Sequence, residues 1–216
     1  MDYELTSQEF EQLSRLVHQQ SGINLHEGKR DLLRARLSKR LRELEMKSFR
    51  AYYDYVLRDT TGREMVTLLD SVSTNLTAFF REPAHLDYLS RVVVPRLAAR
   101  RGAGGGRRLW VWSAGCSTGE EPYSIGLCLL SAISNRAIWD LKVMATDIST
   151  RALETARHGI YSAKRVSSMP PGMLPRFFQR GVGEWTGHYR VKNDVRRLVR
   201  FMRANLLEQP PFGGQL

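Results

Sequence analysis

The stretch WSAGCSTGEEPYS, residues 112–124, follows a short apolar run and holds two glycines ahead of two adjacent acids. An apolar run that enters a glycine-rich loop and then a helix start is typical of a strand–loop–helix unit in a parallel sheet. Ligands of such sheets bind beyond the C-terminal ends of the strands. Gly115 and Gly119 lie at that end, where glycine lets the backbone approach a ligand closely. The stretch therefore predicts both a fold class and a binding site.

The acids in this loop restrict the kind of ligand. The local pattern GCSTGEE is neither the dinucleotide fingerprint nor a Walker loop. A helix N-terminus suits a phosphate, but Glu120 and Glu121 would repel one and favour a ligand with a positive end. The alternative is that both acids only complement the helix dipole.

The pattern after residue 107 alternates between strands and helices. We expect strands at 108–114, 139–148 and within 196–207, and helices at 120–134 and 150–159. This order predicts an α/β fold with a doubly wound, Rossmann-like parallel sheet. Residues 160–193 show no regular pattern.

Asp147 ends the second expected strand, where an acid can accept hydrogen bonds from the hydroxyls of a ribose. The alternative is that Asp147 caps the following helix, together with Ser149. Asp147 and the acidic loop together fit a nucleoside without a pyrophosphate. S-adenosylmethionine is such a ligand, with a cationic sulfur and an amino-acid tail, whereas NAD would require a loop without the acids.

The N-terminal part reads as a small helical domain. A cap at Thr6 precedes a helix with apolar residues at helical spacing, and a leucine stripe marks a second helix from about Lys29. Further helices are expected over 48–59 and 60–73, and one of about 15 residues after Pro83. The run RGAGGGRR, residues 101–108, reads as a flexible surface turn.

The charge is concentrated rather than evenly spread. The chain has a formal net charge of +11, and residues 29–42 hold seven basic side chains against one acid. This segment predicts either an acidic partner or an ordinary solvated basic face. It lacks interleaved aromatic residues and a recognised nucleic-acid motif, so we expect no nucleic-acid partner.

The apolar runs, the N-terminus and the cysteines of the sequence indicate where the protein resides. The sequence contains no apolar run near the 18–20 residues of a membrane span, and its N-terminus does not read as a signal peptide. Cys116 and Cys128 show no metal-like spacing. We expect a reduced, cytoplasmic protein that does not insert into a membrane and is a monomer.

Five segments together resemble the chemotaxis receptor glutamate methyltransferases, the CheR family. They are, in order, GKRDLLRARLSKRLREL, STNLTAFFRE, VWSAGCSTGEEPYSIG, ATDIS followed by AL, AR and GIY, and FMRANLL. The resemblance covers almost the whole chain. It implies methyl transfer from S-adenosylmethionine, with S-adenosylhomocysteine as product, to glutamates on the cytoplasmic helical bundle of a chemoreceptor.

The resemblance also implies roles for particular residues. One acid of the GEEP motif, Glu121 in preference to Glu120, would bind the methionine or ribose part of the cofactor, and Asp147 would hold the ribose. We further hypothesise that Arg81 orients the incoming carboxylate, since a guanidinium matches it; the alternative is a surface or helix-cap arginine. The remaining cofactor residues implied are Asn75, Thr77 and Arg81 of NLTAFFR, Gly115 of the loop, and Asn205 and Leu206 of ANLL.

The basic segment gains a role from the same resemblance. Receptor docking is expected from Arg36, Lys39, Arg40 and Arg42. We assign residues 1–73 to the receptor-docking domain, 74–107 to a linker and helix, and 108–216 to the methyltransferase domain. In the family a further strand with an Arg-Asn pair follows this point, so we expect that domain to be incomplete at its C-terminus. The alternative function is a non-catalytic receptor-binding module.

Overall fold

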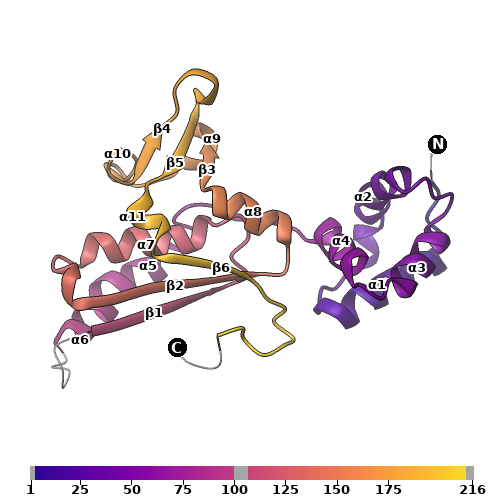
Figure 1. Ribbon diagram of the computed structural model, residues 1–216, viewed down its shortest axis with the longest axis horizontal. Helices are drawn as coiled ribbons and strands as arrows, with labels where there is room; N and C mark the ends of the chain where they lie inside the picture. Colours follow the sequence, from indigo (N-terminus) through magenta and orange to yellow (C-terminus); the bar gives the residue numbers. More distant parts are fainter. Residues whose placement is uncertain (1–2, 100–106, 213–216) are drawn as a thin grey trace. The chain divides into compact units, whose positions relative to one another are not determined.

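A computed structural model describes residues 3–99 and 107–212 in two compact units (Figure 1). Unit 1 comprises Met1–Thr74, Ile148–Thr150 and Asn205–Gln209, and the rest of the chain forms unit 2. Residues 101–106 of the predicted surface turn lie outside the described residues. Within the described part, no helix is both long and apolar enough to cross a membrane.

Unit 1 is helical, as the sequence predicts. Its first helix begins at a capping box, in which the Thr6 hydroxyl accepts from the Glu9 amide and the Glu9 carboxylate accepts from the Thr6 amide. Leu33, Leu37 and Leu41 form the buried stripe of the second helix. The helices of the unit are α1 (Ser7–Ser21), η1 (Glu27–Lys29), α2 (Arg30–Glu43), α3 (Phe49–Arg58) and α4 (Arg63–Val72).

Unit 2 is built on a three-stranded sheet in the order β1-β2-β6, with all strands parallel. This sheet confirms the predicted α/β class. The strands are β1 (Arg107–Ala114), β2 (Trp139–Asp147) and β6 (Val199–Arg203). Since Ala114 pairs with Thr146, and Asp147 with Arg203, the C-terminal ends of all three strands lie along one edge.

Helices pack on this sheet around a buried apolar core. Helix α7 contacts all three strands, and ten of its thirteen residues are buried, as expected for a helix that is covered on most sides. The helix predicted after Pro83 is one run with a π-helical turn at its centre. The helices of this part are α5 (Pro83–Tyr88), η2 (Leu89–Val93), α6 (Val94–Ala99), α7 (Glu120–Ala132), η3 (Arg136–Ile138) and α8 (Thr150–His158).

Residues 160–193, which show no regular pattern in the sequence, form a second, antiparallel sheet in the order β3-β5-β4 (Figure 1). Its strands have only three or four residues, too few for a two-residue alternation to be recognised. Its elements are β3 (Ile160–Ser162), α9 (Ala163–Val166), α10 (Met173–Phe177), β4 (Phe178–Arg180), η4 (Gly183–Trp185), β5 (His188–Val191) and α11 (Asn193–Arg196).

Candidate functional site

The loop between β1 and α7 folds over the end of β2. The backbone amides of Gly115 and Cys116 both donate to the carbonyl of Thr146 at 2.8 Å. Gly115 and Gly119 adopt φ values of +77° and +96°, in the region where only glycine is unstrained. A Cβ on Gly115 would meet open space, whereas one on Gly119 would lie 2.8 Å from the Cβ of Ala156. Gly115 therefore leaves room on the solvent side, and Gly119 allows close packing beneath the loop.

The two adjacent acids of the loop face different surroundings. Glu121 is exposed, lines a cavity and accepts a hydrogen bond from the Ser113 hydroxyl at 2.6 Å. Glu120 is fully buried, accepts from the Thr118 hydroxyl and forms an ion pair with Arg165. Of the two, only Glu121 is placed to meet a ligand in that cavity.

Asp147 lies beside the loop at the end of β2. It is 8% exposed, and its Oδ2 accepts the backbone amide of Ser117 at 2.7 Å. A carboxylate held by a backbone amide is oriented without losing its negative charge. Ser117 itself lines the cavity. Asp147 is thus not itself a lining residue, but it is hydrogen-bonded to one.

The segment NLTAFFRE forms a second wall of the cavity. Phe79 anchors it, since this ring is buried and packs edge-on against Tyr161 and Phe178 at centroid distances of 4.9 and 5.6 Å. Thr77 and Arg81 then line the cavity. The Arg81 guanidinium is exposed and donates to the Leu76 carbonyl at 3.2 Å. Among the described residues it pairs with no carboxylate.

The cavity has a volume of about 600 Å³ and lies wholly within unit 2. It combines two acids, Glu82 and Glu121, with one arginine, one histidine and several apolar side chains. Its lining residues are Leu76, Thr77, Arg81, Glu82, His85, Leu86, Tyr88, Leu89, Val93, Val111, Gly115, Ser117, Glu121 and Ile125. The carboxylate of Glu121, the exposed Gly115 and the adjacent Asp147 fit S-adenosylmethionine, which carries a cationic sulfur and a ribose.

Other predicted site residues lie apart from this lining. Asn75 is exposed. Asn205 and Leu206 belong to unit 1, where the Asn205 amide donates to the Gln20 carbonyl at 2.8 Å and Leu206 is 60% exposed. Their expected contacts with a cofactor remain predictions.

The four basic residues of α2 that were predicted to dock a receptor divide into two groups. Arg40 forms a two-point ion pair with Glu64 at 2.9 and 2.6 Å, and Arg36 donates to the carbonyls of Ser71 and Ser73. Lys39 and Arg42 are exposed, and their side chains make no hydrogen bond or ion pair within residues 3–99 and 107–212. The first pair holds α2 to α4, and the second pair faces solvent.

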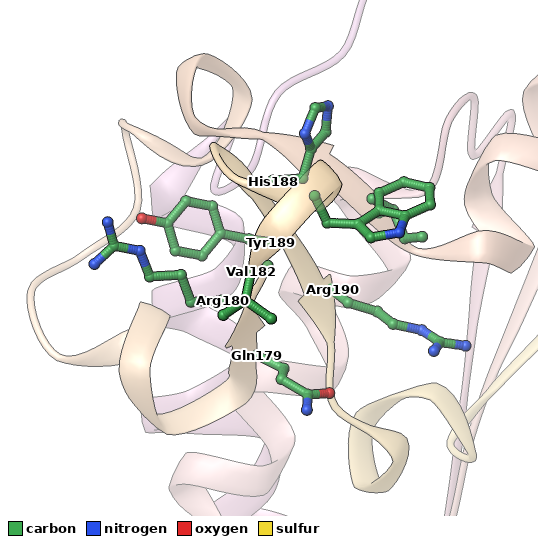
Figure 2. A pocket seen from close by; sticks show the side chains of 9 residues that line it. Gln179, Arg180, Val182, His188, Tyr189 and Arg190 are labelled. Atoms are coloured by element: carbon green, nitrogen blue, oxygen red, sulfur yellow. The ribbon is translucent and has the colours of Figure 1, made fainter.

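A second cavity, of about 330 Å³, lies on the antiparallel sheet (Figure 2). Arg180 and Tyr189 are cross-strand partners and extend to the same side, while Arg190 extends to the other, as alternation along β5 requires (Figure 2). The described residues that line it include no acid. The sequence offered no signal for this surface beyond its positive charge.

The cysteines do not contribute a nucleophile. Both are free and buried, and burial raises the pKa of the Cys116 thiol to about 12. Within the part of the chain that the structure describes, no group of histidine, cysteine or acidic side chains could hold a metal ion.

Comparison with known proteins gives consistent matches. The family model described as "CheR methyltransferase, SAM binding domain" matches residues 75–216, and that of the "CheR methyltransferase, all-alpha domain" matches residues 8–73. The chain is similar to chemotaxis protein methyltransferase 2 of Pseudomonas aeruginosa, with 39% identity over 96% of this chain and 71% of that protein.

Two further relatives bear the name chemotaxis protein methyltransferase. The Salmonella typhimurium protein is 39% identical over 95% of this chain and 68% of its own length. The Borreliella burgdorferi protein is 33% identical over 97% of this chain and 73% of its own length.

Proposed function

Since this chain belongs to the CheR family of S-adenosylmethionine-dependent methyltransferases, we propose that it methylates glutamate side chains on the cytoplasmic helical bundle of a chemoreceptor. The observation that carries this proposal is the cavity at the end of the parallel sheet. There an exposed acid, Glu121, lines one space of about 600 Å³ together with the Arg81 guanidinium, which pairs with no carboxylate in the described part of the chain. The acid suits a cationic methyl donor, and the guanidinium suits a carboxylate acceptor.

We assign the cofactor to the loop and to the ends of β1 and β2. Glu121 binds the positively charged part of the cofactor, Gly115 lets the backbone approach it, and Asp147 holds the ribose hydroxyls. The resemblance of the NLTAFFR motif to that of the CheR family supports further contacts with the cofactor from Asn75 and Thr77. When bound, S-adenosylmethionine supplies an electrophilic methyl group on a positively charged sulfur.

The acceptor needs little activation. A glutamate has an ordinary pKa of about 4.3, so its carboxylate is already ionised at neutral pH and no strong general base is required. One carboxylate oxygen forms a bond to the methyl carbon as the carbon–sulfur bond breaks, and the electron pair of that bond stays on sulfur. The chain's task is to align the two groups and to exclude water.

Arg81 is the residue we assign to alignment of the acceptor. Arg81 is exposed and lines the cavity, and among the described residues its guanidinium donates a hydrogen bond only to a neutral carbonyl, that of Leu76 at 3.2 Å. A guanidinium can donate two parallel hydrogen bonds to a carboxylate. Too tight a pair would weaken the nucleophile, so the contact is expected to be partial.

Recognition of the receptor is assigned to the basic face of α2. Arg36 and Arg40 are engaged within unit 1, so the docking role rests chiefly on Lys39 and Arg42, which face solvent. Acidic surface on the receptor bundle would be attracted to these charges and would meet the enzyme faster at low salt. We place this recognition in residues 1–73 and the protein in the cytoplasm, where that part of a receptor lies.

The proposal is tested by titrating the protein with S-adenosylmethionine and then following transfer of a labelled methyl group to a receptor cytoplasmic fragment. We expect binding and incorporation that disappears when the acceptor glutamates are replaced by alanine. Receptor binding with neither cofactor binding nor incorporation would instead identify a non-catalytic module.

A further inference from the structure

The cofactor loop is held from below by side chains of the β3–α9 segment. The Tyr161 hydroxyl donates to the Thr118 carbonyl at 2.7 Å. Arg165 donates to the Thr118 hydroxyl at 2.5 Å and also forms the ion pair with Glu120. Tyr161 and Arg165, four residues apart, thus hold Thr118 and Glu120, the two residues that flank Gly119.

The buried carboxylate of Glu120 needs a positively charged partner. The carboxylate of Glu120 is 1% exposed, whereas the Arg165 side chain is 36% exposed. A buried charge must be paired, because removal of one partner leaves the other desolvated and uncompensated. Besides this ion pair, the Thr118 hydroxyl donates a hydrogen bond to the carboxylate at 2.7 Å. Glu120 is therefore fixed inward by Arg165.

The loop packs closely against Tyr161 at Gly119. A Cβ on Gly119 would lie 2.9 Å from the Tyr161 hydroxyl oxygen. The Arg165 guanidinium lies over the Tyr161 ring at 5.4 Å, and Phe79 packs edge-on against the same ring. Burial raises the pKa of Tyr161 well above its ordinary value, so its hydroxyl stays a donor across the physiological range.

We propose that Arg165 is a positioning residue for cofactor binding: its ion pair keeps Glu120 buried, so that the loop begins α7 with Glu121 facing the cavity. The proposal rests on the proposed function, because it treats residues 115–121 as the cofactor loop. Neighbouring side chains on one helix start point in different directions. Release of Glu120 would therefore turn Glu121 away from the cavity and disorder the amides beside Asp147.

The test compares Arg165→Met with Lys164→Met, which removes one positive charge from the neighbouring exposed position of α9. The readouts are the Kd for S-adenosylhomocysteine by calorimetry, and hydrogen exchange of amides 117–121 in the ligand-free protein. We expect Arg165→Met to raise the Kd about tenfold and to speed exchange in this loop, whereas Lys164→Met stays within about twofold of wild type. In methylation assays, the KM for S-adenosylmethionine should rise more than kcat falls.

A double variant, Arg165→Met with Glu120→Gln, separates positioning from stability. It leaves no unpaired buried charge, so the unfolding midpoint should recover while the Kd stays raised. Arg165→Lys keeps the charge and should recover part of the affinity. An Arg165→Met protein that is less stable but binds S-adenosylhomocysteine as Lys164→Met does would overturn the proposal. Absence of binding by the wild type would overturn the proposed function and this inference with it.

Discussion

Replacement of Gly119 by alanine gives the sharpest test of how the loop is built. The residue has φ +96°, and its new Cβ would lie 2.8 Å from the Ala156 Cβ and 3.1 Å from the Ala156 Cα. The left-handed backbone costs an L-residue about 1–2 kcal/mol, and overpacking a tight core costs about 1–3 kcal/mol. We therefore expect Gly119→Ala to lower the free energy of unfolding of unit 2 by about 2–5 kcal/mol.

Urea unfolding followed by tryptophan fluorescence measures this change for unit 2 alone, because all four tryptophans of the chain belong to that unit. Gly115→Ala is the matched control, since φ is +77° there but the added Cβ meets open space. It should cost only about 1–2 kcal/mol of stability and should instead weaken cofactor binding. Equal losses of stability in the two variants would refute the packing argument.

Three further substitutions and one pair of measurements on Cys116 have defined outcomes. Arg81→Ala should abolish methyl transfer while the Kd for S-adenosylmethionine rises much less; full turnover would exclude the alignment role. Arg40→Met leaves the carboxylate of Glu64, whose side chain is 5% exposed, without its guanidinium, and should cost about 3–5 kcal/mol in thermal or urea unfolding. Arg42→Ala should change stability by less than about 0.5 kcal/mol but should flatten the salt dependence of methylation, and an unchanged salt profile would argue against docking. Because burial raises the pKa of Cys116 to about 12, this thiol is neutral in the folded protein at pH 8 and should react with a thiol reagent only after unfolding. The free energy of unfolding should also fall as the pH rises from about 9 towards 12, since over this range the thiol ionises only in the unfolded state.

The repeating parts of the fold could be predicted from the sequence because they extend over many residues. The strand ending at Ala114, the helix that begins at Glu120 and the strand ending at Asp147 all agree with their apolar patterns. The antiparallel sheet was missed, because its strands are three or four residues long and are defined by pairing rather than by local pattern.

The site was predicted in its chemistry more than in its geometry. The family resemblance favoured Glu121 over Glu120, but the residues alone did not show the reason, because Glu120 pairs with Arg165, a residue 45 positions later in the chain. In the same way, seven basic residues over 29–42 look alike in the sequence. Only the buried Glu64 and the end of α4 distinguish Arg40 and Arg36 from their exposed neighbours.

The most direct measurement is a crystal structure of the protein with S-adenosylhomocysteine. We expect density in the cavity beside Gly115, with Glu121 near the amino-acid portion and the ribose hydroxyls within hydrogen-bond distance of the Asp147 carboxylate. A ligand bound elsewhere, or a ribose with no contact to Asp147, would contradict this assignment.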